Sequence, residues 1–277
     1  MKLPVLLIHG IAQRDESPYQ SNAWGRVPDA LRTAGATVAF ANQDAFGSVS
    51  SCGKQIVRAI ERVCADTGCT QLHVVAHSKG GLDAQAALRD TQATQRVLSL
   101  TTLSSPHRGL RFCDALSRSR LIIPRIVAPL VDGVARLWGD HAPCAKQVLA
   151  DLTSSEAHDR QSQHAAHEAK GDEILTSVGF ALPPPRGLAR LMPAGAAVRA
   201  CDGPNDGLIP LWSTEAGSWI VLQVTEAGFD HADACDLRKR DFALRGSDGR
   251  TYSSIVPFLV EHLASIEAKQ GSSQPAA

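Results

Sequence analysis

Residues 72–81 read Leu-His-Val-Val-Ala-His-Ser-Lys-Gly-Gly. The run opens with apolar residues typical of a buried parallel strand and stops at a serine that two glycines soon follow. Residues 82–88 are rich in good helix formers. The pattern predicts a tight strand-to-helix turn that holds the hydroxyl of Ser78 clear of both elements.

Such a turn leaves no room for side chains two positions before and two positions after the serine. Ala76 and Gly80 occupy these positions, with alanine where glycine is usual. Small residues near a strand end also occur by chance. The apolar run before Ser78 and the helix formers after it favour a nucleophile elbow.

The rest of the chain alternates between strand and helix patterns. Strands are expected at 4–11, 36–40, 97–103, 196–201 and 219–224, and helices at 23–32, 53–65 and 252–266. This order predicts an α/β fold with a mostly parallel sheet and helices on both faces.

One long segment interrupts the alternation. Residues 110–190 show no convincing strand, so we expect a helical cap inserted between core segments 1–109 and 191–268, and a disordered tail at 269–277. Apolar residues are dense between 121 and 138, where Pro124 and Pro129 would break a helix. Either the cap packs them away, or they form a mobile lid that covers a substrate pocket and contacts lipid.

Charge and composition exclude several classes of partner. Lys plus Arg equals Asp plus Glu at 28 each among 277 residues, so nothing favours nucleic acid or an anionic membrane. We expect no transmembrane segment and see no secretory leader, which favours a cytoplasmic protein, or a secreted one whose leader was removed.

The seven cysteines lack CxxC pairs, and their number is odd. A structural zinc is not expected, and reduced thiols are the simplest interpretation. Whether Cys201 and Cys235 form a disulfide is left open.

Three polar residues each follow a strand, in the order Ser78, Asp206, His231. A serine hydroxyl needs a base within reach and a group that orients the base. We expect His231 to take the serine proton and Asp206 to fix the imidazole. His107 is an alternative base, and Asp202 and Asp230 are alternative acids.

The oxyanion of a tetrahedral intermediate needs backbone donors. We expect them to be the amides of Lys79, at the helix start, and Ile11, after His9-Gly10. The Lys79 side chain either is solvated or ion-paired, or favours an anionic substrate group.

Five motifs together resemble the bacterial true lipases of the Pseudomonas, Burkholderia and Proteus type, within the α/β-hydrolase superfamily. They are Pro-Val-Leu-Leu-Ile-His-Gly-Ile (4–11), Val-Ala-His-Ser-Lys-Gly-Gly (75–81), Ser-Ser-Pro-His-Arg-Gly (104–109), Asn-Asp-Gly-Leu-Ile-Pro (205–210) and Asp-His-Ala-Asp (230–233). The resemblance covers most of the chain and implies the same triad and the same oxyanion donors, Ile11 and Lys79.

Two departures from that family stand out. Ala76 and Lys79 replace a glycine and a glutamine or methionine in the elbow. The family's calcium ion ties the histidine loop to an earlier aspartate; Asp233 matches one ligand, but residues 185–188 contain no carboxylate. We therefore expect no cofactor, with calcium at Asp233 or an Asp233–arginine salt bridge as the open choice.

The resemblance implies a serine carboxylic-ester hydrolase, a lipase or lipase-like esterase that forms an acyl-enzyme on Ser78 and acts on ester or lipid substrates. A polyester depolymerase (polyhydroxyalkanoate-type) or thioesterase on the same triad is the alternative. A catalytically silent protein that binds a hydrophobic ligand or partner is the alternative from another class.

Overall fold

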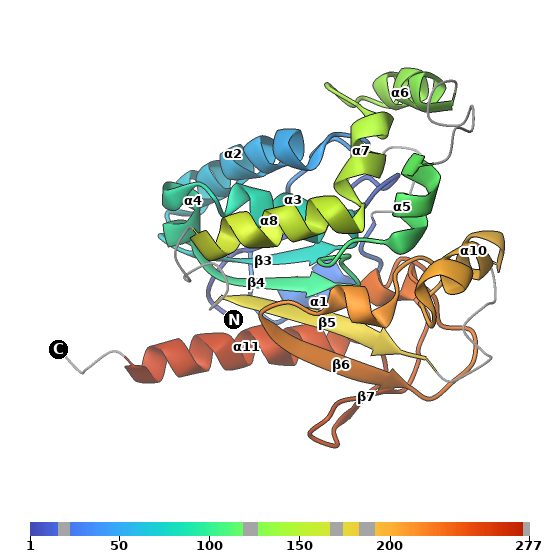
Figure 1. The fold of residues 1–277 in the computed structure, drawn as a ribbon. Helices are drawn as coiled ribbons and strands as arrows, with labels where there is room; N and C mark the ends of the chain where they lie inside the picture. Colours follow the sequence, from blue (N-terminus) through green and yellow to red (C-terminus); the bar gives the residue numbers. More distant parts are fainter. Residues whose placement is uncertain (16–22, 119–126, 167–173, 183–191, 274–277) are drawn as a thin grey trace.

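The computed structural model describes residues 1–15, 23–118, 127–166, 174–182 and 192–273. Its centre is an eight-stranded sheet in the order β2-β1-β3-β4-β5-β6-β7-β8 (Figure 1). The strands are β1 Val5–Ile8, β2 Val38–Phe40, β3 Leu72–His77, β4 Val97–Leu103, β5 Leu175–Ala181, β6 Ser218–Val224, β7 Leu244–Arg245 and β8 Thr251–Tyr252.

The helices fall between these strands. They are α1 Val27–Thr33, α2 Val49–Thr67, α3 Lys79–Ala87, α4 Thr91–Arg96, α5 Arg111–Arg118, α6 Ala128–Leu137, α7 Ala145–Asp151, α8 Ser154–Ala166, α10 Met192–Asp202 and α11 Ile255–Ser273, with short 3-10 turns η2 Leu211–Thr214 and η3 Asp233–Cys235. None of these helices is long and apolar enough to cross a membrane.

The first six strands in the sheet order are parallel, and β7 and β8 add an antiparallel hairpin at one edge. Side chains alternate between the two faces of a strand. In β1, Val5 and Leu7 join one hydrophobic core, whereas Leu6 and Ile8 join another. The prediction of a mostly parallel sheet with both faces buried is therefore confirmed.

Each core is closed by its own helices. Leu31 of α1 and Leu259 of α11 belong to the first core, and Ile56 of α2 and Ala84 of α3 belong to the second. Figure 1 shows α11 on one side of the sheet and α2, α3 and α8 on the other. This two-sided cover leaves the carboxyl ends of the parallel strands as the place where loops from distant segments meet.

The structure corrects three expectations. β5 lies inside the segment 110–190 expected to be purely helical, so the sheet resumes earlier than expected. Its residues Leu-Thr-Ser-Val-Gly-Phe-Ala mix polar and apolar types, yet five of the seven are buried between β4 and β6. The small polar residues of this strand interrupt the continuous apolar run from which a strand buried on both faces is predicted.

The second correction concerns residues 196–201, which form part of helix α10 and not a strand. Alanine is the strongest helix former, and this segment is alanine-rich. The third correction is that α11 runs to Ser273, so the expected disordered tail does not begin at 269. Residues 274–277, and the apolar residues 121–126, lie outside the described parts of the chain.

Two helical glycines offer a test of how tightly the elbow packs. A methyl group on Gly80 would come within 2.4 Å of the His9 carbonyl oxygen, whereas one on Gly133 of α6 would meet nothing within 4 Å. We expect Gly80→Ala to lower the free energy of unfolding by about 1–3 kcal/mol through overpacking. Gly133→Ala should raise it by roughly 0.5–1 kcal/mol, because alanine loses less entropy in a helix.

Urea unfolding of both variants measures the difference. Equal effects of the two substitutions would contradict the close contact between the elbow and the loop after β1.

Candidate active site

Ser78 is the single residue between β3 and α3. Its backbone has φ 56° and ψ −132°, a conformation that costs a non-glycine residue about 1–3 kcal/mol. The Ser78 amide donates to the Leu103 carbonyl at 2.9 Å, which ties the turn to β4. The predicted elbow is confirmed in its position, and its backbone strain is of the kind found at functional sites.

The loop that follows β1 lies directly against this elbow. A Cβ atom on Gly10 would be 2.8 Å from the Cβ of Ser78, and one on Gly80 would be 2.7 Å from the Ile8 carbonyl oxygen. Only glycine at both positions allows such an approach. The first loop of the chain is thereby placed beside Ser78.

His231 and Asp206 form a direct pair. The Nδ1 atom of His231 lies 2.8 Å from a carboxylate oxygen of Asp206, and the His231 amide donates to the Asp206 carbonyl at 2.8 Å. The other carboxylate oxygen of Asp206 accepts from the amides of Leu208 and Ile209. Burial alone would raise the pKa of Asp206, but His231 and these amides more than offset it and lower the pKa. Asp206 is therefore a carboxylate at neutral pH and orients the imidazole.

His77 joins the elbow to His231. Its ring packs against the His231 ring with centroids 4.5 Å apart, and its Nε2 lies 3.1 Å from the His231 carbonyl oxygen. Burial lowers the pKa of His77 well below its usual value, so the ring is neutral and Nε2 donates. The residue next to Ser78 thus supports the histidine loop.

The alternative acids, Asp202 and Asp230, and the alternative base, His107, are bonded to other groups. Asp202 accepts from the amides of Arg111 and Phe112 and caps α5. Asp230 pairs with Arg238 and accepts from the Ala232 amide. The ring of His107 is bonded to the Thr102 hydroxyl and the Gln85 amide oxygen, both at 2.8 Å. Of the sequence candidates, the structure brings Asp206 and His231 together.

Of the two expected oxyanion donors, Lys79 follows Ser78 in the chain, and Ile11 follows Gly10, whose backbone lies against Ser78. Within the described parts of the chain, neither the Ile11 amide nor the Lys79 amide donates to a protein acceptor. Lys79 is the first residue of α3, where helix geometry leaves amides without internal partners and concentrates positive potential. Both amides are thus available to a bound oxyanion.

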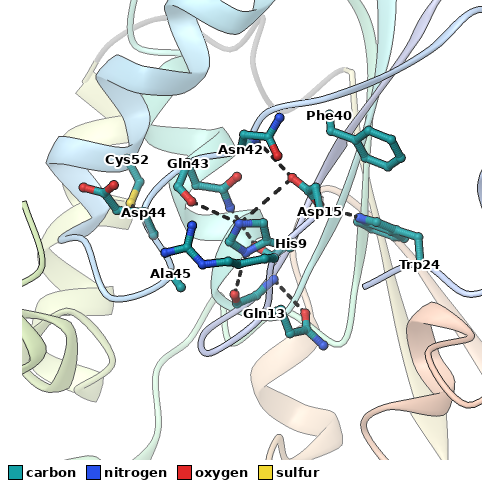
Figure 2. Close-up of polar contacts among 12 residues, drawn as sticks. His9, Gln13, Asp15, Trp24, Phe40, Asn42, Gln43, Asp44, Ala45 and Cys52 are labelled. Atoms are coloured by element: carbon teal, nitrogen blue, oxygen red, sulfur yellow. Dashed lines mark hydrogen bonds and ion pairs between the residues drawn. The ribbon is translucent and has the colours of Figure 1, made fainter. Parts of the chain in front are cut away.

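A network around His9, which sequence reasoning missed, shapes the loop that carries Ile11 (Figure 2). The His9 ring nitrogens lie 2.8 Å from the Gly10 carbonyl and 3.0 Å from the Gln43 carbonyl. Gln13 accepts from the Gly10 amide at 2.9 Å, and Gln43 donates to the His9 carbonyl at 2.8 Å. The only sequence signal was the polar composition of these loops.

The side chain of Lys79 does not face a substrate. It is 1% exposed, and its ammonium group lies 2.6 and 2.8 Å from the carboxylate oxygens of Asp83 and 3.6 Å from the Cys52 sulfur. Burial would lower the pKa of Lys79, but the attraction of Asp83 outweighs it. The salt-bridge interpretation is confirmed, and selection of an anionic substrate by this side chain is wrong.

Arginines hold the loop that carries His231. Asp233 accepts from Arg240 at 2.5 and 3.0 Å, and Asp236 accepts from Arg26 at 2.6 Å. Asp233 also accepts from the Asp230 amide at 2.8 Å. All three aspartates of this loop are buried. The salt bridge from Asp233 to an arginine is therefore present.

The contacts of Asp233 also test whether a calcium ion could bind at this loop. No group of three or more acidic, histidine or cysteine side chains suited to a metal occurs in the described parts of the chain. Both oxygens of Asp233 contact Arg240, whose positive charge would repel a cation. The region 185–188 lies outside the described residues. The residues around Asp233 do not fit a calcium ion.

The seven cysteines are free thiols. Cys201 is exposed and Cys235 is buried, so the bridge left open by the sequence is not formed.

Comparisons with known proteins agree with this geometry. A profile of the alpha/beta hydrolase fold matches residues 4–121. Triacylglycerol lipases of Pseudarthrobacter phenanthrenivorans and Burkholderia plantarii are each 34% identical over 116 residues, 41% of this chain but only 36% and 32% of their own lengths. The matched segment thus spans about a third of these relatives.

Solved structures extend the likeness over the whole chain. The Staphylococcus hyicus lipase superposes with a TM-score of 0.65 at 15% identity, covering 99% of this chain and 98% of its own. A Bacillus licheniformis lipase gives 0.62 at 17% identity, covering 86% and 88%. By its sheet, its elbow and these matches, the chain has the α/β-hydrolase fold and is similar to bacterial lipases.

Proposed function

We propose that the protein hydrolyses carboxylic esters through an acyl-enzyme formed on Ser78. The observation that carries the proposal is the buried Asp206–His231 pair, held by His77 next to a strained serine. The similarity of residues 4–121 and of the fold to lipases supports the same reaction class. The ammonium group of Lys79, the residue after Ser78, is tied to Asp83 and is not available to favour an anionic acyl donor.

The chemistry follows from the orientation of the imidazole. Nδ1 of His231 is bonded to Asp206, which leaves Nε2 to accept the Ser78 proton as the hydroxyl oxygen attacks the ester carbonyl. The developing oxyanion accepts from the amides of Ile11 and Lys79. His231 then gives the proton to the leaving alcohol, and the same steps with water release the acid.

For the substrate we propose lipid esters presented at an interface. The relatives that are 34% identical to this chain over 116 residues are named triacylglycerol lipases. Helix α6 exposes a run of apolar side chains, with Leu130 68%, Leu137 87% and Trp138 58% exposed. Figure 1 shows α6 standing apart from the sheet, at the end of the molecule where α5 and α7 lie. Such a helix suits contact with an apolar surface.

We also propose that calcium has no part in holding the His231 loop. The Arg240–Asp233 and Arg26–Asp236 pairs occupy the carboxylates that a metal would need. The loop is then held by ion pairs within the chain.

Substitution of the nucleophile is the first test. Ser78→Ala should reduce hydrolysis of nitrophenyl esters by at least about a thousandfold, because the covalent step is lost. A fluorophosphonate should label the wild-type protein at Ser78, and the matched variant Ser247→Ala, which alters an exposed serine, should label and hydrolyse normally. A folded wild-type protein that takes no label would overturn the proposal in favour of a silent binding protein.

The same assay identifies the acyl class. Activity only on short-chain esters in solution would identify an esterase and exclude a lipase. Preference for thioesters or polyesters would identify a thioesterase or a polyester depolymerase.

The second test concerns α6. The double variant Leu137→Ser, Trp138→Ser should slow hydrolysis of emulsified long-chain triacylglycerol by about tenfold or more, since each apolar carbon withdrawn from an interface costs about 0.8 kcal/mol. Hydrolysis of a soluble short-chain ester should not change. Arg136→Gln on the same helix is the control, because the emulsion is uncharged. Equal loss on both substrates would argue that these residues only pack the cap.

The third test concerns the histidine loop. Arg240→Gln leaves the buried Asp233 without its arginine and should lower the free energy of unfolding by about 2 kcal/mol, less than for a fully buried pair because Arg240 is partly exposed. It should also lower kcat, whereas Arg245→Gln, an exposed arginine on β7, should do neither. Excess chelator should leave the wild-type rate unchanged. Loss of activity that added calcium restores would contradict the ion-pair account.

A further inference from the structure

A cavity separate from the candidate triad lies on the face of the sheet that α2, α3 and α8 cover. Its volume is about 350 Å³, at the lower end of the range for small-molecule sites. Neither Ser78, Asp206 nor His231 lines it. Its walls come from α2, from the end of α3 and the turn into α4, and from α7 and α8, and include Lys54, Arg58, Arg89, Asp90, Asp151, Glu156 and Arg160. Figure 1 shows α2, α3 and α8 on one side of the sheet.

Four of the wall residues are cations, namely Lys54, Arg58, Arg89 and Arg160. The first three are exposed. Within the described parts of the chain, none of the four has a carboxylate oxygen within 4.0 Å or a recorded hydrogen-bond partner. Other half-buried arginines, such as Arg26 and Arg240, are paired with aspartates.

Arg160 is the unusual member of this set. Its Nη1 and Nη2 atoms are shielded from solvent and have no hydrogen-bond partner. Burial lowers the pKa of Arg160, although Asp151 and Glu156 partly offset this, and Arg89 adds repulsion. A guanidinium without partners is costly to bury, so a bound anion would stabilise it.

The acidic wall residues are mostly engaged by other groups. Asp90 accepts from the amides of Gln92 and Ala93 and caps α4. Asp151 accepts from the Val49 amide at 2.7 Å and from Gln147 at 3.0 Å. Glu156 is half-buried on the same helix as Arg160, yet it makes no hydrogen bond to the Nη1 and Nη2 atoms of Arg160. These carboxylates leave the four cations available.

We propose that this cavity, named here the α2–α8 pocket, binds a phosphate group, free or as a small phosphomonoester. A guanidinium presents paired N–H donors that match two oxygens of a phosphate, and its flexible side chain turns toward the cavity to do so. Lys54, Arg58 and Arg89 add charge at the rim and favour a dianion over a single carboxylate. The site is separate from ester hydrolysis and does not depend on it.

Binding is measured by calorimetry and by thermal unfolding of the full chain at constant ionic strength, with inorganic phosphate, glycerol phosphate and acetate as probes. Wild type should bind phosphate and show a raised Tm, while acetate should bind at least about tenfold more weakly. Tighter binding of glycerol phosphate than of inorganic phosphate would identify a phosphomonoester as the ligand, and the reverse order would identify the free ion.

Arg160→Gln should weaken phosphate binding by about tenfold or more, the effect of losing one charge-assisted contact of about 1.4 kcal/mol or greater. Arg89→Gln, which alters an exposed residue and spares the fold, should weaken it several-fold. Arg62→Gln, also on α2 but outside the cavity, should bind as wild type does. Phosphate binding that is absent, or that Arg160→Gln and Arg89→Gln both leave unchanged, would overturn the proposal.

Discussion

The contact between the loop after β1 and the turn at Ser78 is the constraint on which the site depends. The backbone of Ile8 and His9 approaches the start of α3 so closely that a single methyl group on Gly80 would meet carbonyl oxygens at 2.4 and 2.7 Å. Parallel pairing of β1 with β3 brings the two loops to the same edge of the sheet. Glycine at positions 10 and 80 then lets them touch, which places Gly10, the neighbour of Ile11, beside Ser78.

Charge pairing organises the remainder of that edge. Asp206 is held by His231 and by two backbone amides, while Asp230, Asp233 and Asp236 each have an arginine. A buried carboxylate without partners would raise its pKa and lose its charge. Because the neighbouring aspartates are neutralised by arginines, Asp206 is left as the carboxylate that orients the imidazole. The Lys79–Asp83 pair applies the same rule inside α3 and removes a charge from the neighbourhood of the serine.

Two surfaces do not follow this pattern of charge pairing and burial, and each indicates a different kind of partner. Helix α6 exposes Leu137 and, at its C-cap, Trp138, although most large apolar residues in the other described parts of the chain are buried. The α2–α8 pocket leaves Arg160 without an anion, whereas Arg26, Arg238 and Arg240 are each paired with an aspartate. The first favours contact with an apolar phase, and the second favours a phosphate. Since the two surfaces use different elements, a loss at one need not disturb the other.

The sequence by itself determined the alternating architecture, the elbow and the order of the candidate triad, because each rests on local patterns. Continuous apolar runs indicate buried strands, small residues at positions 76 and 80 indicate the elbow, and turn-forming residues after a strand indicate a loop. Each of these signals lies within a few neighbouring positions of the chain. It also located His231, and it named Asp206 among three acids. The sequence interpretation was wrong for residues 175–181 and 196–201. The first segment is a buried strand although it contains Thr and Ser, and the second is a helix because it is rich in alanine, so hydrophobicity alone indicated neither.

Only the tertiary structure decided between Asp202, Asp206 and Asp230, because that choice depends on which donors surround each carboxylate. It likewise decided that the Lys79 side chain turns inward, that His77 supports His231, and that arginines 26, 238 and 240 hold the histidine loop. The Lys79–Asp83 pair is 4 positions apart within one helix, whereas the contacts of Arg240, His77 and Arg26 join residues 7, 154 and 210 positions apart. Pairings over such separations follow from the folded arrangement of strands and loops, and no local pattern in the chain encodes them.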